Sequence, residues 1–254
     1  MLQLIANSAN KNASGAWREQ REQKYKLLVL FVTVSAVYVF MVINWLGQAC
    51  FKIQSGEFVM VIDPFAKEVG FAPPRFRADA VLVTHAHFDH ANSASLTGDP
   101  FVITGPGEYE VKGVYVEGIE TFHDNSQGKE RGFNTIYRIE MEGLRLAHLG
   151  DFGESAMRDE TVEALGDIDI LMIPVGGRFT IDAEEAAKVV KQIEPRYVIP
   201  MHYKIPGLKI AIDSAEDFLK EMGAAKIEAQ EKFVIKKKDI GEEEKTEVIL
   251  LKPA

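Results

Sequence analysis

The sequence predicts a mixed α/β (α+β) fold in which two β-sheets pack against each other with helices on the outside. In the first half of the chain, short apolar runs separated by turn residues are typical of hairpins. In the second half, helical stretches alternate with strands. The length of 254 residues suits one such domain, and 46% apolar and 26% charged residues are ordinary for a globular protein.

The strands are predicted from apolar and β-branched runs bounded by turn residues. In chain order they cover residues 42–46, 49–53, 58–62, 80–84, 101–104, 113–118, 134–140, 144–149, 169–174 and 197–201. Helices are predicted at 158–166, 183–193 and 213–222. The second helix begins after Asp182, whose carboxylate can cap it. Near the C-terminus, FVIKKK and EVILLKP flank a charged turn and predict a final hairpin at a sheet edge.

Residues 1–40 are predicted to be an N-terminal extension, and residues 41–254 the folded domain. Residues 1–26 are polar, whereas residues 27–43 form an almost unbroken apolar run preceded by basic residues. One interpretation is a membrane anchor over residues 27–46, because a spanning helix needs about 20 apolar residues. The alternatives are a spurious upstream start of translation ahead of Met41 and an extra buried strand.

Charge and cysteine content restrict the partners and the compartment. The net charge of −9 disfavours a nucleic-acid partner, because phosphate binding needs a basic surface. The only cysteine, Cys50, excludes an intramolecular disulfide and fits the cytoplasm, with a membrane-anchored location as the alternative. We therefore expect a small-molecule substrate and a membrane contact only through residues 27–46. The oligomeric state stays open, a homo-oligomer included.

The chemistry of the chain is concentrated in the segment VLVTHAHFDH. It places His85, His87, Asp89 and His90 within six residues, directly after a predicted buried strand. Imidazoles and carboxylates are suitable ligands for zinc, manganese or iron. In an extended segment, His85 and His87 point the same way because side-chain direction repeats every two residues. The cluster has no structural benefit and would leave buried charge unpaired, so it predicts a metal site.

Other parts of the chain offer further ligands. His123 lies in the loop TFHDNSQG, and Asp151 and His202 each follow a predicted strand. Because these side chains come after strand ends, we expect them to gather with the first cluster on one rim of the sheets. His148 lies inside a strand, and we predict that it is structural or supports the ligands rather than binding metal.

The order of these motifs resembles the metallo-β-lactamase superfamily. THAHFDH is followed by His123, by HLGDFG with Asp151 and by PMHY with His202. More narrowly, NWLGQACFKI, IDPF, RGFNTIY and IPVGGRFTIDAEEA are similar to the branch of small zinc-dependent hydrolases related to L-ascorbate-6-phosphate lactonase. The resemblance covers residues 41–204. It implies a four-layer αβ/βα sandwich of two mixed β-sheets flanked by helices.

The resemblance also implies a centre of two divalent metal ions, with zinc expected first and manganese or iron as alternatives. Each ion would be held by three side chains, and a seventh would bridge the pair. The first set is His85, His87 and His123, the second is Asp89, His90 and His202, and the bridge is Asp151. Gln48 is a departure, since relatives often have histidine there, and it concerns substrate contacts or the support of the ligands.

These features predict a hydrolase in which hydroxide held between two metals attacks an ester, a lactone or a phosphate-bearing small molecule. The resemblance implies that Asp89 or Asp151 guides the proton to the leaving group, which makes these two residues the catalytic candidates. The predicted substrate contacts are Arg131, Asn134 and Tyr203.

Three alternatives remain. A nuclease or phosphodiesterase of the same superfamily is disfavoured by the negative charge and by the short segment between Asp151 and His202. A di-iron redox enzyme would place glutamate between the first histidine and the aspartate, where this chain has His87. A non-catalytic metal-binding protein with this fold is the third, and open coordination positions would separate catalytic from structural use.

Overall fold

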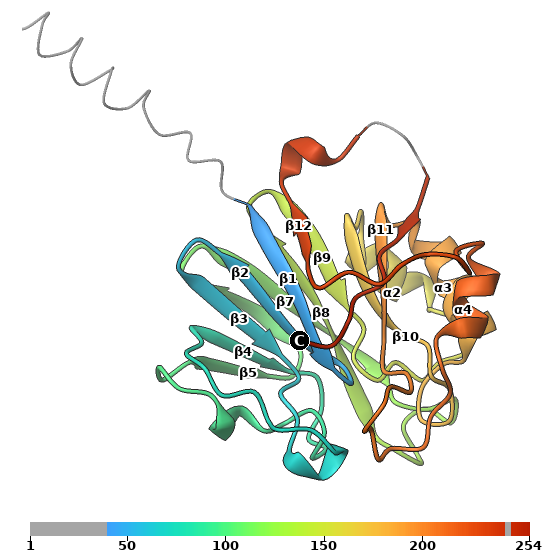
Figure 1. The fold of residues 1–254 in the computed structure, drawn as a ribbon, viewed down its shortest axis with the longest axis horizontal. Coiled ribbons are helices and arrows are strands. Elements are labelled where there is room, and N and C mark those ends of the chain that lie inside the picture. The colour runs from blue at the N-terminus through green and yellow to red at the C-terminus, as the bar shows by residue number, and fades with distance from the viewer. Residues whose placement is uncertain (1–39, 242–244) are drawn as a thin grey trace, which may run out of the picture. The chain divides into compact units, whose positions relative to one another are not determined.

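Two mixed β-sheets lie face to face in this computed structural model, which describes residues 40–241 and 245–254 (Figure 1). The first sheet has the strand order β12 (Phe233–Ile235), β1 (Met41–Gly47), β2 (Cys50–Ser55), β3 (Phe58–Ile62), β4 (Ala80–Val83), β5 (Phe101–Thr104). The second has the order β13 (Glu247–Val248), β11 (Tyr197–Met201), β10 (Ile170–Pro174), β9 (Leu144–His148), β8 (Phe133–Met141), β7 (Val114–Phe122), β6 (Gly107–Val111).

The main core lies between the sheets and follows from the period-two pattern of the strands. In β1, Met41, Ile43 and Trp45 are fully buried, whereas the alternate residues are partly exposed. In β3 and β4 both faces are buried, which explains the unbroken apolar runs FVMVI and AVLV. One set of alternate side chains in these strands joins the main core, and the other set packs in a smaller cluster on the outer face.

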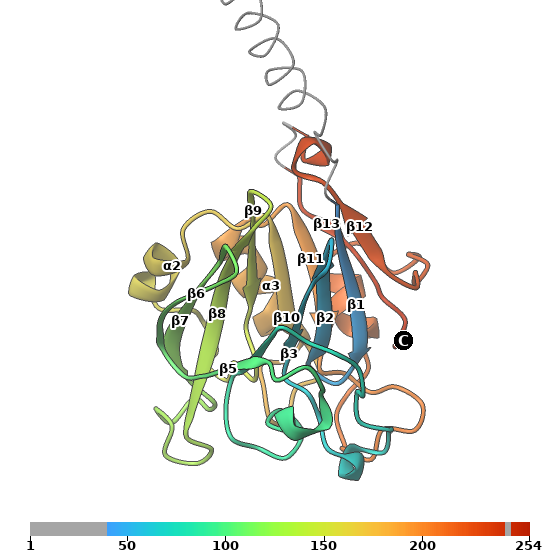
Figure 2. The same ribbon diagram turned by 90° about the vertical axis from the view of Figure 1, so that its left-hand side faces the viewer.

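The outer layers differ between the two sheets. The α-helices α2 (Asp159–Leu165), α3 (Ala183–Ile193) and α4 (Glu216–Glu221) lie on the side of the second sheet (Figures 1 and 2). Asp182 and Glu185 form a reciprocal capping box at the start of α3, as the sequence predicts for Asp182. Over the first sheet, loops with the short 3₁₀ helices η1 (Lys67–Val69) and η2 (Ser93–Ser95) cover the smaller cluster. The predicted fold class is confirmed.

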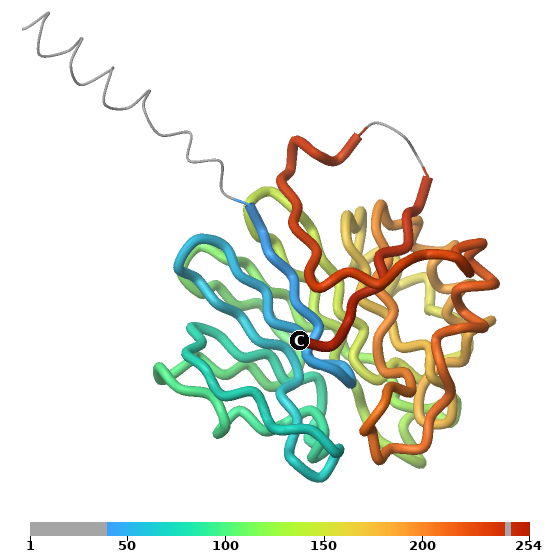
Figure 3. The backbone as a smooth tube through the Cα atoms, viewed as in Figure 1, coloured from blue at the N-terminus to red at the C-terminus, as the bar shows by residue number. Residues whose placement is uncertain are grey.

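The predicted final hairpin is wrong. Strand β12 pairs antiparallel with β1 in the first sheet, whereas β13 pairs parallel with β11 in the second. The two C-terminal segments therefore follow separate paths, which the tube in Figure 3 makes visible. The sequence pattern indicates two short strands at these segments. The strand with which each one pairs depends on which sheet edge has unpaired backbone groups next to it. Strand β6 was not predicted, because its sequence GEYEV is mostly polar and exposed at an edge.

The predictions for the N-terminal region lie largely outside the described residues. The extension over residues 1–40 is described only at Phe40, and the apolar run only from there onward. Residues 41–47 form β1, in agreement with the predicted strand 42–46. Within residues 40–241 and 245–254, no helix has the length and apolar character that crossing a membrane requires.

Candidate metal centre

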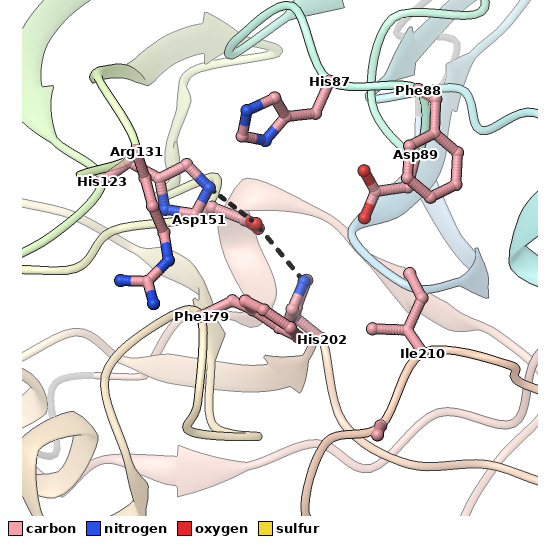
Figure 4. Close-up of a pocket in the computed structure, with 10 residues that line it drawn as sticks. His87, Phe88, Asp89, His123, Arg131, Asp151, Phe179, His202 and Ile210 are labelled. Carbon is pink, nitrogen blue, oxygen red and sulfur yellow. Dashed lines mark ion pairs between the residues drawn. The ribbon is translucent and has the colours of Figure 1, made fainter.

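All seven predicted ligands lie at one rim of the two sheets, and the structure brings them together. They follow four strand ends: His85, His87, Asp89 and His90 after β4, His123 after β7, Asp151 after β9, and His202 after β11. Strands from both sheets thus contribute to the cluster. Figure 4 shows Asp151 between His123 and His202, with His87 and Asp89 further around the same site.

Asp151 is at the centre of the cluster. Its Oδ2 lies 3.4 Å from His123 Nε2 and 3.4 Å from His202 Nε2. Its Oδ1 lies 3.3 Å from His90 Nε2. Ligands bound to one tetrahedral zinc at about 2.1 Å are separated from one another by about 3.4 Å. The spacing of these donor atoms therefore fits side chains that share a cation.

The donor atoms form three overlapping groups, and the atoms of each lie within 4.8 Å of one another. The groups are His85 with His87 and His123, Asp89 with His90 and His202, and His85 with His90 and Asp151. The first two groups have the same members as the two sets implied by the family resemblance. The third combines Asp151 with one histidine from each set, so Asp151 lies where both sets meet.

Several of these atoms are buried and have no hydrogen-bond partner among the described residues. They include His85 Nε2, His90 Nε2 and Asp151 Oδ1, all of which face the centre of the cluster. A buried polar atom without a partner costs about 1–3 kcal/mol, so such atoms need an explanation. Divalent cations bound in the cluster would supply it, because they would accept lone pairs from these atoms. The residues present therefore fit a metal centre.

The protonation of the cluster also suits metal binding. Burial, reinforced by the neighbouring His90, lowers the pKa of His85 to about 2, and burial lowers the pKa of His123. Burial raises the pKa of Asp151, but His202 and His90 lower it more, so it lies well below its usual value. Neutral imidazoles and ionised carboxylates are the forms that bind metal. His90 is the exception in the protein without metal: burial lowers its pKa, yet Asp151 and Asp63 outweigh this and raise it, so metal binding there would have to displace a proton.

Asp63 forms hydrogen bonds that orient the loop carrying the first predicted ligands. Its Oδ2 lies 2.8 Å from His90 Nδ1 and accepts a hydrogen bond from the Thr84 hydroxyl. Its Oδ1 accepts the Thr84 backbone N–H. A carboxylate on the far nitrogen of a histidine orients the ring and makes it more basic toward metal. The sequence reasoning missed Asp63, although it follows the end of β3 just as Asp151 and His202 follow theirs.

Gln48 connects two of the ligand segments. Its side-chain amide donates to Asp89 Oδ2 at 3.0 Å. Its backbone carbonyl accepts the His202 N–H at 3.0 Å and the Trp45 indole N–H at 2.9 Å. The residue is fully buried, and its φ of 54° places the carbonyl and the side chain toward different ligand segments. The departure from the family pattern at this position therefore concerns the support of the ligands.

We expect the Gln48→Leu substitution to lower metal affinity by about 10- to 100-fold, because it removes the hydrogen bond that orients Asp89. Leucine retains the apolar packing, so the fold should persist. The measurement is a competition titration against a chromogenic chelator, with circular dichroism to monitor folding. Gln54→Leu is the matched control, since the Gln54 amide only donates to Gly56. Equal affinities for the two variants and the wild type would contradict this role.

Asn134 supports Asp151 through its side chain. Its amide donates to Thr121 Oγ1 and to the Leu149 carbonyl, and its Oδ1 accepts the Asp151 N–H at 3.0 Å. Gly150 makes this contact feasible, because a Cβ at that position would overlap Asn134 Oδ1. Asn134 is fully buried and does not line the cavity described below. Its predicted contact with substrate stays a prediction.

Tyr203 and His148 pack behind the centre. The ring of Tyr203 is buried against Trp45, with 4.8 Å between ring centroids, and does not line the cavity. The substrate contact predicted for Tyr203 stays a prediction. His148 Nε2 lies 2.9 Å from the Ala49 carbonyl oxygen, and its Nδ1 accepts the Gly150 N–H. This agrees with the structural role predicted for His148.

A cavity of about 460 Å³ opens directly onto the cluster. Its lining combines predicted ligands with other residues from four loops: His87, Phe88, Asp89, His123, Arg131, Asp151, Phe179, His202, Ile210 and Ala211. Arg131 lines this cavity, and its predicted contact with substrate stays a prediction. Sequence reasoning missed Phe88, Phe179 and Ile210. Of these three residues, only Phe88 could have been inferred to line the site from the sequence, because it lies between the predicted ligands His87 and Asp89.

The chain is similar to known metal-dependent hydrolases. Residues 42–202 match the family described as the beta-lactamase superfamily domain. A UPF0173 metal-dependent hydrolase from Thermococcus onnurineus is 32% identical over 238 residues, which cover 83% of this chain and 96% of the relative. A Thermotoga maritima structure assigned to the Zn-dependent hydrolases of the metallo-beta-lactamase superfamily has 33% identity and a TM-score of 0.64, covering 84% of this chain and all of that one.

A more distant structure shares the fold alone. The metallo hydrolase Igni18 from Ignicoccus hospitalis aligns with a TM-score of 0.55 at 19% identity, covering 78% of this chain and 99% of that one. The family match spans more than half of the chain, and it begins in β1 and ends at the predicted ligand His202. Fold, ligand cluster and relatives lead to the same conclusion: the chain belongs to the beta-lactamase superfamily and is a metal-dependent hydrolase with the metallo-β-lactamase fold.

Proposed function

We propose that the protein binds two divalent metal ions and hydrolyses an ester, a lactone or a phosphate-bearing small molecule. The observation that carries the proposal is the arrangement of donor atoms at the cavity floor. Two groups of three predicted ligands meet at Asp151, whose carboxylate lies 3.3–3.4 Å from His123 of the first group and from His90 and His202 of the second. Zinc is proposed first, because the ligands are imidazoles and carboxylates at tetrahedral spacing. The T. maritima relative is also named for zinc.

The bound metals would lower the pKa of a water and polarise the scissile bond. Side chains of the protein would transfer the proton and orient the reacting groups. Asp89 is ionised, because the hydrogen bond and charge of His90 outweigh burial and lower its pKa to about 2. It lines the cavity, so it is the proposed carrier of the proton from the attacking water to the leaving group. Gln48 would hold this carboxylate in its orientation.

The substrate is proposed to be a small molecule in the cytoplasm. The cavity volume is in the range of ordinary small-molecule sites, and Arg131 is the one arginine or lysine among the described residues that line it. Nucleic-acid binding needs several cations along a groove, so the nuclease alternative is not favoured. The single cysteine, Cys50, is buried and free, which suits the reducing compartment of this proposal.

The test combines elemental analysis with a hydrolysis screen of ester, lactone and phosphodiester substrates. We expect about two equivalents of metal per chain, with turnover that is lost on chelation and restored by zinc. Protein produced from Met1 and from Met41 should give the same result, because every ligand lies after residue 84. One tightly held equivalent without turnover would refute the proposal in favour of a structural metal.

A further inference from the structure

The cavity over the metal centre has two chemically different sides. In Figure 4, Arg131 lies on one side of Asp151, and Phe88 and Ile210 lie on the other. The side chains of Phe88 and Phe179 are unusually exposed for large apolar residues, at 54% and 40%. Single exposed apolar residues are common, but these two line the same cavity. Phe179 lies against Arg131, whereas Ile210 adds to the apolar surface on the side of Phe88.

Arg131 has no strong partner within the described part of the chain. Its guanidinium lies 5.7 Å from the Phe179 ring centroid and 3.8 Å from the carboxylate of Glu130. The Glu130 contact is long, and that side chain is 61% exposed, so the pair contributes little. Among the described residues the guanidinium N–H groups donate no hydrogen bond. The guanidinium is therefore available to bind an anion.

The loop that presents Arg131 is held rigidly. The buried Asp124 carboxylate accepts four backbone N–H groups of this loop, from Ser126, Gly128, Glu130 and Arg131. Arg131 is thus fixed at its own backbone, and its side chain rests on the ring of Phe179. A preorganised binding group loses less entropy when ligand binds, so this construction suits a recognition site.

We infer that the substrate carries an anionic group, bound by Arg131, and a ring-sized apolar group, bound by Phe88 and Ile210, on opposite sides of the bond that is cleaved. This inference rests on the proposed function, since it takes the ligand cluster between the two sides as the place of reaction. A guanidinium with free N–H donors suits a carboxylate or a phosphate. An exposed phenyl ring beside an isoleucine suits an aromatic or alicyclic group.

The test is a binding measurement, so it does not depend on turnover. Calorimetry on the protein as purified with its metal would compare 4-phenylbutyrate, the neutral 4-phenylbutan-1-ol and butyrate, which lacks the ring. We expect 4-phenylbutyrate to bind at least about 10-fold more tightly than either of the others. Absence of binding by 4-phenylbutyrate, or equal affinity for all three, would overturn the inference.

Variants separate the two sides of the cavity. Arg131→Gln should weaken the binding of 4-phenylbutyrate by about 10-fold, because a charge-assisted hydrogen bond is lost. The affinity for the neutral alcohol should stay unchanged. Arg178→Gln is the matched control, since this exposed arginine is adjacent to Phe179 but does not line the cavity. If Arg131→Gln leaves the preference for the anion intact, the metals bind the anion and the inference is wrong.

For the apolar side, Phe88→Ala should weaken the binding of 4-phenylbutyrate by about 5-fold and leave the affinity for butyrate unchanged. Phe101→Ala is the control, because Phe101 is equally exposed, at 55%, but lies in β5 away from the lining. Metal content is measured for each variant, and Ile210→Ala replaces Phe88→Ala if the neighbouring ligands lose metal. Ring-dependent binding that resists both substitutions would overturn the inference. If binding follows the expected pattern while no substrate class is hydrolysed, only the proposed function fails.

Discussion

Replacing Asp151 with asparagine is expected to release about one equivalent of metal per chain and to lower kcat/KM by at least about 1,000-fold. The physical reason is the position of this carboxylate, whose oxygens lie 3.3–3.4 Å from the Nε2 atoms of His90, His123 and His202. Asparagine keeps the shape but removes the charge and one of the two acceptor oxygens. The measurements are elemental analysis and steady-state hydrolysis of any substrate found in the screen.

The matched control for this substitution is Asp167→Asn, which makes the same chemical change at a side chain that is 99% exposed. It should leave metal content and turnover unchanged. Thermal unfolding of the metal-free proteins shows whether Asp151→Asn still folds. Wild-type metal content and activity in the Asp151 variant would show that this residue does not hold the two ligand groups together.

The second large effect is expected at Asp63, where two substitutions should separate stability from metal binding. Asp63→Ala leaves the buried Thr84 N–H and His90 Nδ1 without an acceptor. Each such loss costs about 1–3 kcal/mol, so we expect the free energy of unfolding to fall by about 3 kcal/mol. Urea denaturation of the metal-free protein measures this.

Asp63→Asn should be less destabilising but should lower metal affinity by about 10- to 100-fold. The amide oxygen can still accept the Thr84 N–H, which leaves the amide nitrogen facing His90 Nδ1. The histidine then carries its proton on Nε2, the atom that faces Asp151 and would otherwise bind metal. Chelator competition tests this, and unchanged affinity in the asparagine variant would contradict the role assigned to Asp63.

Part of the site was predictable because it depends on local patterns. The sequence HAHFDH after a buried strand indicates a metal site without any knowledge of packing. The rule that ligands follow strand ends also located Asp151 and His202, and it applies equally to Asp63, to which it was not extended. The two ligand sets, by contrast, were implied by the family resemblance rather than by the residues, and the spacing of the donor atoms agrees with them.

The C-terminal strands show where local patterns are insufficient. FVIKKK and EVILLKP have the composition of strands, and their closeness in sequence favours a hairpin. In the structure they complete the edges of different sheets, beside β1 and β11. Pairing depends on which free edge lies within reach after the two sheets have packed, and this is a long-range property.

The sequence by itself determined the strand pattern, the types of ligand and the chemistry they support, because periodicity and short motifs are local. Only the tertiary structure decided which neighbouring side chains face the cavity. Arg131 and Asn134 belong to the same short segment, ERGFNT, yet Arg131 lines the cavity and Asn134 is buried behind Asp151. The difference arises because Asn134 is in β8, where one face of the strand meets the other sheet. Arg131 is in the preceding loop, whose backbone N–H groups donate hydrogen bonds to Asp124.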